Sequence, residues 1–361
     1  MIGALVFNLI AVFFAWLESS RLFKHGLKFS LFTIFLFLAL RYDYGNDYQR
    51  YLVFFSDVVT RANQGSFSPS IRGNEIGWFY LNLAFSPLGF FAMIAALAAL
   101  TSFVLYRFIR KYVPPQYYWF AVFFYVFQPY NMLILSSAMR QEVSIIIFIV
   151  ALDFIIRKKI IIYFVLIFIA TLFHSSAAIL YPFILLGFYR WSIKLYYILI
   201  AFLIFMLIVI FNRELFSIVE LITIGYFDFY TGALDLAEFK VNVGLGFALN
   251  IGFYLLSLFY AQKDTDINNN ILYQLTIISL LLIPIGFVVP LMSRLNFYLI
   301  PTMMAVFSIT ITKMNKSIIR FGFISLFILF TCYQFYYFFQ SETWKMDYGE
   351  YHTIFSSYHI Y

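Results

Sequence analysis

The sequence predicts an all-α polytopic membrane protein, and three observations lead to that fold class. Hydrophobic residues make up 63% of the 361 residues, whereas soluble domains contain about 45–50%. Only 11% of the residues are charged, and the charges come in small groups between long apolar runs. These features exclude a soluble enzyme, a disordered chain and a nucleic-acid-binding module, in spite of a net charge of +7.

The apolar runs predict the number of membrane spans. A helix needs about 20 mostly apolar residues to cross a bilayer, and several of the runs are shorter, so we expect about ten to twelve transmembrane helices. The run over 160–189 is interrupted near His174 and by Pro182, and it is either one kinked helix or two short ones. The first run has no basic start and no cleavage site of a signal peptide. The runs are 2–17, 29–40, 76–106, 117–135, 142–156, 160–173, 176–189, 195–211, 246–262, 271–290, 295–312 and 320–340.

The distribution of charge predicts the orientation of these helices. Alternate connections hold 15 of the 24 Lys and Arg residues, and the remaining connections hold 13 of the 17 acids. Loops rich in Lys and Arg stay on the cytoplasmic side, and basic groups such as 157–159 need no explanation beyond this rule and attraction to anionic lipid. We therefore expect one membrane domain, 1–361, with both termini outside. Its external parts are loop 41–75, loop 212–245 and tail 341–361. The pattern of 212–245 predicts an amphipathic helix on the outer surface, and the alternative is a lid over a site.

The connections on the predicted cytoplasmic side restrict the chemistry. They are too short to house a soluble catalytic domain, and the chain contains no phosphate-binding loop, dinucleotide glycine motif or HExxH zinc motif. A single cysteine, Cys332, excludes an internal disulfide and a multi-cysteine metal site. We therefore expect any reaction to take place in the membrane or on its outer face, without ATP or nucleotide sugars as direct substrates.

Polar clusters at the predicted external level are the candidate sites, because charges beside a membrane are costly without a function or a partner. The segment 41–50 combines acids, arginines and tyrosines, which suits a sugar; it could also be an interfacial anchor. Glu75 in 72–78 precedes a long apolar run. It is either a base or sugar ligand, or an acid favoured by the helix dipole.

Three further clusters contain single basic residues. Arg140 in 136–142 suits bidentate phosphate binding at a helix start, or it forms a buried ion pair with Glu142. His174 interrupts a strongly apolar stretch, where it is either a general base or a packing residue. Arg294 follows Pro290; it either forms a diphosphate clamp with Arg140 or is held by backbone carbonyls at a broken helix end.

In this order, the clusters resemble the EpsG family of bacterial exopolysaccharide and O-antigen polymerases of the Wzy type. The similarity runs from about residue 40 to the end and includes the tyrosine-rich tail. The first motif reads Tyr44-Gly45-Asn46-Asp47 where Gly-Thr-Asp is expected, which leaves the role of Asn46 open. The matching segments are 41–48, 75–78, Arg140-Gln141, 173–175 and 294–298.

The resemblance implies a lipid-linked glycosyltransferase, similar to GT-C-type enzymes, in the inner (cytoplasmic) membrane of a bacterial cell. Its substrate would be an undecaprenyl-diphosphate-linked oligosaccharide repeat. A hydroxyl of one repeat would attack C1 of the growing chain, and undecaprenyl diphosphate would leave. The resemblance implies no nucleotide sugar, cofactor or metal, and a chain-length regulator protein is a candidate partner.

The chemistry of the residues fits this reaction, because preorganised arginines stabilise the charge that develops on a leaving diphosphate. His174 ranks first as the base, since an imidazole can be neutral at pH 7. The candidate catalytic residues are His174, Asp47 and Glu75. The candidate diphosphate-binding residues are Arg140, Arg294, Gln141 and Arg41. The candidate sugar-binding residues are Asp43, Tyr44, Tyr48 and Trp78.

Three other functions stay open at this point. An O-antigen ligase would share the arginines and the histidine, but its loss would leave long lipid-linked polymer instead of single repeats. A flippase of lipid-linked repeats would need charges along a route from the inner face, where Asp153 stands alone among the apolar residues. A membrane acyltransferase usually has a histidine together with an Asn or Asp in a tunnel.

Overall fold

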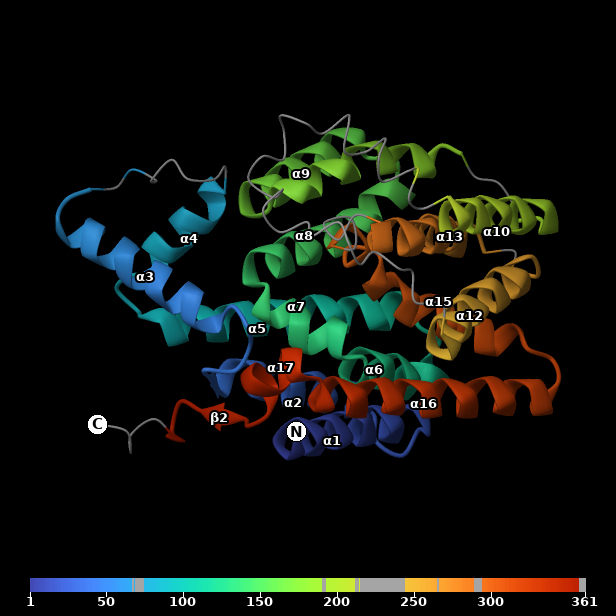
Figure 1. Ribbon diagram of the computed structural model, residues 1–361, viewed down its shortest axis with the longest axis horizontal. Coiled ribbons are helices and arrows are strands. Elements are labelled where there is room, and N and C mark those ends of the chain that lie inside the picture. Colours follow the sequence, from blue (N-terminus) through green and yellow to red (C-terminus); the bar gives the residue numbers. More distant parts are fainter. Residues whose placement is uncertain are drawn as a thin grey trace. The chain divides into compact units, whose positions relative to one another are not determined.

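The computed structural model describes residues 1–66, 68, 75–189, 193–211, 214, 244–264, 266–288 and 294–356. Nearly all regular structure in this part of the chain is helical (Figure 1). The chain divides into two compact units, unit 1 with Met1–Tyr189 and Lys316–Tyr361, and unit 2 with Arg190–Asn315. The expectation of one membrane domain, 1–361, stays a prediction.

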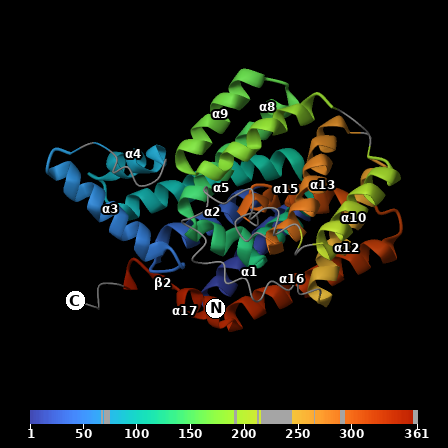
Figure 2. The ribbon, with the colours of Figure 1, turned by 45° about the horizontal axis from the view of Figure 1, so that its top comes forward.

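Unit 1 contains the two ends of the chain. Helix α1 packs against α2 and α6, α2 packs against α5, and α8 packs against α9, as Figure 2 shows for the green pair α8 and α9. Its elements are α1 (Ile2–Ser19), α2 (Gly26–Leu40), β1 (Arg41–Tyr42), α3 (Tyr48–Asn63), α4 (Ile76–Phe85), α5 (Phe90–Tyr112), η1 (Pro115–Tyr117), α6 (Tyr118–Phe127), the π-helix η2 (Tyr130–Ile134), α7 (Leu135–Ser137), α8 (Met139–Ile156), α9 (Ile160–Phe173), the 3-10 helix η3 (Ser175–Gly187), α16 (Ser317–Gln340), α17 (Glu342–Tyr348) and β2 (His352–Thr353).

Unit 2 is a small group of apolar helices. Helix α13 packs against each of the other three, and Tyr254 of α12 lies edge-on to Phe307 of α15 with 5.8 Å between ring centroids. The described elements are α10 (Leu195–Ile210), α12 (Leu245–Ala261), α13 (Ile267–Val288) and α15 (Ile300–Lys313).

The apolar helices confirm an all-α polytopic membrane protein. Within the described residues, four helices are long and apolar enough to cross a membrane, and a bent pair, Pro115–Phe127 with Tyr130–Ser137, would make a fifth. Seven further apolar helices have 10–17 residues. The prediction of ten to twelve spans therefore depends on these shorter helices, and it stays a prediction.

The predicted run 117–135 is a broken segment in the structure. Its two halves meet at an angle of 70°. Pro129 lacks a backbone N–H and disfavours helical geometry at the residue before it, and Gln128 is accordingly extended with ψ 107°. The break is followed by a π-helical turn and α7, so α8 begins at Met139 and its first turn carries Arg140.

Other predicted runs also divide differently from the sequence prediction. The run 76–106 forms two helices, α4 and α5, with Gly89 at φ +90° between them. The run 160–189 forms α9 and the 3-10 helix η3, because His174 is extended with φ −151° and ψ 117°. The predicted loop 41–75 contains α3. Most of the predicted loop 212–245 lies outside the described residues.

Ion pairs between distant residues agree with the predicted alternation of connections. Glu75 contacts both Arg140 and His174, and all three belong to the predicted external set. The pairs Arg110–Glu18, Lys111–Asp153 and Lys313–Asp264 belong to the predicted cytoplasmic set. These contacts join residues predicted to share a side; which side faces the cytoplasm stays a prediction.

Candidate functional site

Three of the predicted site residues meet in unit 1, in what we call the Glu75 cluster: Glu75, Arg140 and His174. Glu75 directly precedes α4, Arg140 is the second residue of α8, and His174 directly follows α9. Arg140 Nη1 forms an ion pair with Glu75 Oε2, and His174 Nδ1 lies 2.8 Å from Glu75 Oε1. One carboxylate therefore bridges a guanidinium and an imidazole at the ends of three helices.

Small side chains bring these helix ends together. A Cβ atom at Gly77 of α4 would lie 3.0 Å from the carbonyl oxygen of Leu172, so the glycine permits α4 to approach the last turn of α9. Ser144 of α8 donates a 2.7 Å hydrogen bond to the Ala170 carbonyl in the same turn. The positions of Glu75 and His174 thus follow from close backbone packing.

Tyr51 of α3 is a second partner of Arg140, and the sequence prediction missed it. Arg140 Nε donates to the Tyr51 hydroxyl at 3.4 Å, and the guanidinium lies over the tyrosine ring, 5.7 Å from its centroid. Trp78 packs edge-on against the same ring at 5.2 Å. Burial raises the pKa of the Tyr51 phenol, although Arg140 opposes the shift, so the hydroxyl stays neutral and the guanidinium keeps its charge.

Two nitrogen atoms of the Glu75 cluster stay available for a ligand. Arg140 Nη2 and His174 Nε2 make no hydrogen bond to any residue in the described ranges. The Arg140 side chain is 39% exposed and that of His174 is 16% exposed. A carboxylate beside Nδ1 favours the tautomer that is protonated there, which leaves Nε2 as a proton acceptor.

The first motif, 41–48, folds around the break before α8. Arg41 is buried, and its Nη2 donates a 2.8 Å hydrogen bond to the Ser136 carbonyl. The Asp47 N–H donates to Ser137 Oγ at 3.0 Å. Gly45 has φ +128°, and a Cβ atom there would lie 2.7 Å from the same Oγ. The positive φ and the close approach of Ser137 each explain why glycine occupies this position.

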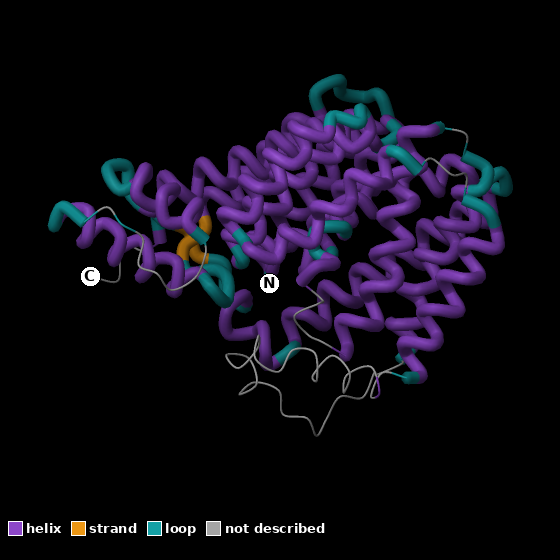
Figure 3. The backbone as a smooth tube through the Cα atoms, turned by 90° about the horizontal axis from the view of Figure 1, so that it is seen from above, coloured by secondary structure: helices purple, strands orange, loops and turns teal. Residues whose placement is uncertain are grey.

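The C-terminal tail completes this motif. The Tyr348 hydroxyl donates to Asn46 Oδ1 at 3.0 Å, which gives Asn46 a structural role. Burial raises the pKa of Tyr348 to about 12, so the hydroxyl remains a neutral donor. Strands β1 and β2, orange in Figure 3, pair antiparallel with Arg41 opposite Thr353.

The surroundings of the other predicted site residues differ from one residue to the next. The rings of Tyr44, Tyr48 and Trp78 are buried, and their burial favours packing roles over stacking on a sugar. Asp47 pairs with Arg50 at 3.3 Å. Asp43 is exposed, whereas Gln141 is buried. Arg41 is engaged inside the protein, as described above, and Arg294 is an exposed residue of unit 2. The predicted sugar and diphosphate roles of these residues stay predictions.

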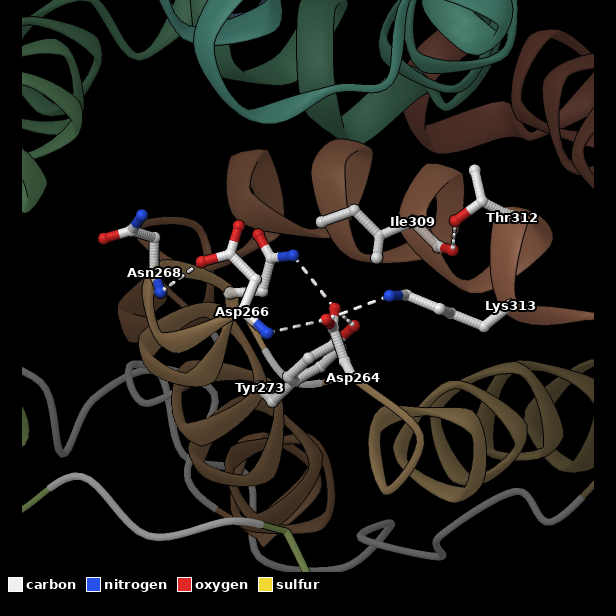
Figure 4. Close-up of polar contacts among 8 residues, drawn as sticks. Asp264, Asp266, Asn268, Tyr273, Ile309, Thr312 and Lys313 are labelled. Atoms are coloured by element: carbon white, nitrogen blue, oxygen red, sulfur yellow. Dashed lines mark hydrogen bonds and ion pairs between the residues drawn. The ribbon is translucent and has the colours of Figure 1, made fainter.

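A second polar cluster, the Asp264 cluster, lies in unit 2 between α12, α13 and the end of α15 (Figure 4). Asp264 Oδ1 accepts from Lys313 Nζ at 3.0 Å and from the Asp266 N–H at 3.0 Å. Its Oδ2 accepts from the Tyr273 hydroxyl at 2.8 Å and from Asn269 Nδ2 at 2.9 Å. The Asp264 side chain is 2% exposed, so protein donors surround it.

The hydrogen bonds of the Asp264 cluster determine its ionisation. Burial raises the pKa of the Asp264 carboxyl, but its hydrogen bonds with Asp266, Lys313, Tyr273 and Asn269 lower it by more, so the net pKa lies below the ordinary value. The carboxylate is therefore charged at neutral pH, and it ties three helices of unit 2 together.

Comparisons with known proteins give one match. A family model described as the EpsG family matches residues 27–358, a range that contains the Glu75 cluster and the tail. No curated protein and no solved structure matches the chain. Among the described residues, no group of three or more His, Cys, Asp and Glu side chains is placed to hold a metal ion.

Proposed function

Because this chain belongs to the EpsG family, a family of Wzy-like polymerases, we propose that it polymerises lipid-linked oligosaccharide repeats. The repeats would be carried on undecaprenyl diphosphate at the outer face of the bacterial cytoplasmic membrane. The observation that supports this proposal is the Glu75 cluster, in which one carboxylate holds an imidazole and a guanidinium. In the proposed reaction the imidazole acts on the acceptor hydroxyl and the guanidinium on the leaving diphosphate.

The proposed reaction assigns a separate role to each member of the cluster. His174 Nε2 accepts the proton of the acceptor hydroxyl as its oxygen attacks C1 of the donor sugar. The bond from C1 to the diphosphate oxygen breaks, and undecaprenyl diphosphate leaves with the electron pair. Arg140 Nη2 faces the leaving oxygen and stabilises its charge. Glu75 positions the imidazole and stabilises the imidazolium that forms.

The position of Glu75 distinguishes it from the other candidate bases. Both of its oxygens are engaged, one by Arg140 and one by His174, so we place it as a positioning residue. One oxygen of Asp47 forms an ion pair with the exposed Arg50. Asp47 is our second choice for the base. The diphosphate role expected for Arg294, in unit 2, stays a prediction from the sequence.

The test is the chain length of the surface glycan in a host whose own copy of the gene is deleted. Complementation with His174→Ala or Arg140→Ala should leave lipid-linked single repeats and no ladder, with normal protein in the membrane. The matched controls are His25→Ala, an exposed histidine outside the cluster, and Arg61→Ala, whose ion pair with Asp57 lies on the surface of α3.

The other outcomes of that experiment would reject the proposed residue roles or indicate a different function. Normal ladders from both cluster variants would reject the proposed roles. Accumulation of long lipid-linked polymer in the deletion strain would indicate an O-antigen ligase. Loss of all surface glycan, with repeats trapped inside the cell, would indicate a flippase.

A further inference from the structure

A basic pocket lies in unit 1 at the C-terminal ends of α5 and α8, and α8 carries Arg140 of the Glu75 cluster at its other end. It has a volume of about 500 Å³ and lies between the C-terminal halves of α5 and α8. This volume is within the range of about 300–1,000 Å³ that is typical of small-molecule sites. Four cations and one carboxylate line it: Arg107, Arg110, Lys111, Arg157 and Asp153.

Two of the four cations are already paired. Lys111 Nζ pairs with Asp153 Oδ1, and the Tyr112 hydroxyl donates to the same oxygen at 2.6 Å. Arg110 pairs with Glu18 at 2.6 Å. These contacts connect α1, α5 and α8 at one level, and they give the pocket a fixed polar wall.

The other two cations have no acidic partner in the part of the chain that the structure describes. Neither Arg107 nor Arg157 forms an ion pair with a described residue, and both are exposed. Arg107 lies over the Phe103 ring, 5.9 Å from its centroid, which directs the guanidinium along α5. A planar guanidinium binds phosphate oxygens in a bidentate manner, so the pocket presents two unneutralised phosphate-binding groups.

The pocket also has an apolar side that is open to the surroundings. Phe103 lies four residues before Arg107 and is 57% exposed; Val150 lies seven residues before Arg157 and is 41% exposed. Both helices therefore present exposed apolar residues toward their middle and cations at their C-terminal end. A free anion needs only the cations, whereas a phospholipid matches both parts, with its phosphate at the cations and its acyl chain along the apolar residues.

We propose that this pocket binds the phosphate of an anionic phospholipid in the membrane leaflet at which α5 and α8 end. In the predicted orientation this is the cytoplasmic leaflet, which attracts basic segments. The proposal is independent of the function proposed above. The site recognises a headgroup between two defined helices, in contrast to the diffuse attraction of surface lysines such as Lys158 and Lys159.

The experiment compares lipid retention by the purified full-length protein in detergent. Native mass spectrometry would count phosphatidylglycerol bound at increasing concentrations, with phosphatidylcholine as the neutral reference. Arg107→Gln/Arg157→Gln should weaken phosphatidylglycerol binding by about thirtyfold, the factor that two interfacial charges give. The matched control, Lys158→Gln/Lys159→Gln, removes the same charge from residues that do not line the pocket, and it should weaken binding several times less than the pocket variant does.

Four outcomes would overturn the proposal. Equal loss in both double variants would show diffuse attraction only, and equal retention of phosphatidylcholine would show no headgroup recognition. Displacement of phosphatidylglycerol by millimolar inorganic phosphate would show a site for free phosphate. Stronger binding of farnesyl diphosphate than of phosphatidylglycerol would assign the pocket to a polyisoprenyl diphosphate.

Discussion

The Glu75 cluster and the Asp264 cluster each contain one carboxylate with a cationic partner. They differ in how many of their hydrogen-bonding atoms are occupied by the protein. Asp264 is almost fully buried and accepts four hydrogen bonds from the protein. Glu75 engages only Arg140 and His174, and each of these keeps one nitrogen without a hydrogen bond to a described residue.

This difference shows how to distinguish a structural ion pair from a candidate site. In the Asp264 cluster every acceptor is used, the donors come from the same small unit, and a ligand would have to replace existing bonds. In the Glu75 cluster the carboxylate orients two basic side chains, Arg140 and His174. Both side chains are partly exposed, and each keeps one nitrogen that can contact a ligand. The first arrangement stabilises a fold, and the second can act on a substrate.

The largest expected effect is the loss of the proposed base. His174→Ala should lower the rate of repeat-unit polymerisation by about 10²–10⁴, the usual contribution of general acid–base catalysis. Asp264→Asn should leave the rate per folded molecule within about twofold, because Asp264 shares no hydrogen bond with the Glu75 cluster and its partners are all in unit 2. Polymer formed by membranes containing equal amounts of each protein gives the comparison. Equal losses for both variants would erase the distinction between the clusters.

The next effect tests whether the geometry of Arg140 matters. Arg140→Ala should lower the rate by about 10²–10³, as the removal of one preorganised donor does. Arg140→Lys keeps the charge but loses the planar fork and the contact with Tyr51, so it should recover little of the rate. Recovery to the wild-type rate with lysine would reduce the role of Arg140 to that of a simple charge.

In the Asp264 cluster we expect a change of stability. Asp264→Asn should lower the free energy of unfolding of unit 2 by about 1.5–3 kcal/mol, the contribution of hydrogen bonds to a charged group. Thermal unfolding in detergent would show a lower Tm for this variant. The matched variant Asp57→Asn, in a surface pair of α3 with half-exposed side chains, should change the Tm little. A Tm equal to that of the wild type for Asp264→Asn would argue against a structural role.

The pH dependence of this stability has a defined sign. The pKa of the folded Asp264 carboxyl lies below its ordinary value of 3.8, so its stabilising contribution is fully present above that value. It is lost as the pH falls through the lower, folded pKa. The difference in Tm between wild type and Asp264→Asn should therefore be constant from about pH 5 to pH 8 and shrink below about pH 4. A difference that grows on acidification would contradict the lowered pKa.

The smallest effect is expected in the first motif. Tyr348→Phe removes the hydrogen bond to Asn46 and should lower the free energy of unfolding by about 0.5–1.5 kcal/mol. Tyr337→Phe, an exposed tyrosine of α16, is the control. If Tyr348→Phe abolished polymerisation in spite of normal stability, the tail would have to be assigned to the site together with the Glu75 cluster.

Local signals in the sequence predict much of this structure but not its contacts. Glu75, Arg140 and His174 are each recognisable as polar residues that interrupt or flank apolar runs. The contact between these three residues cannot be recognised from the sequence, because it depends on the approach of α4 to α9 at Gly77. Tyr51 was missed because an aromatic residue in a helix carries no local sign of a functional contact.

Helix α3 shows a signal that was present and not used. Its buried residues Tyr48, Tyr51, Phe55 and Val58 are spaced by three and four residues, which is the spacing of one face of a helix. The high charge of 41–75 led to the prediction of a loop. The break at Pro129 was likewise visible as a proline, but hydropathy alone merged its two halves into one run.

The pairing of β1 with β2 has a consequence for biosynthesis. Residues 41–46 leave the ribosome long before residues 347–354, which supply their strand partner and the Tyr348 hydroxyl. The strand pairing of β1 and the hydrogen bond of Asn46 can therefore form only after the helices between these two segments have been synthesised. A chain that stopped before residue 347 would leave β1 without its strand partner and Asn46 Oδ1 without the Tyr348 hydroxyl.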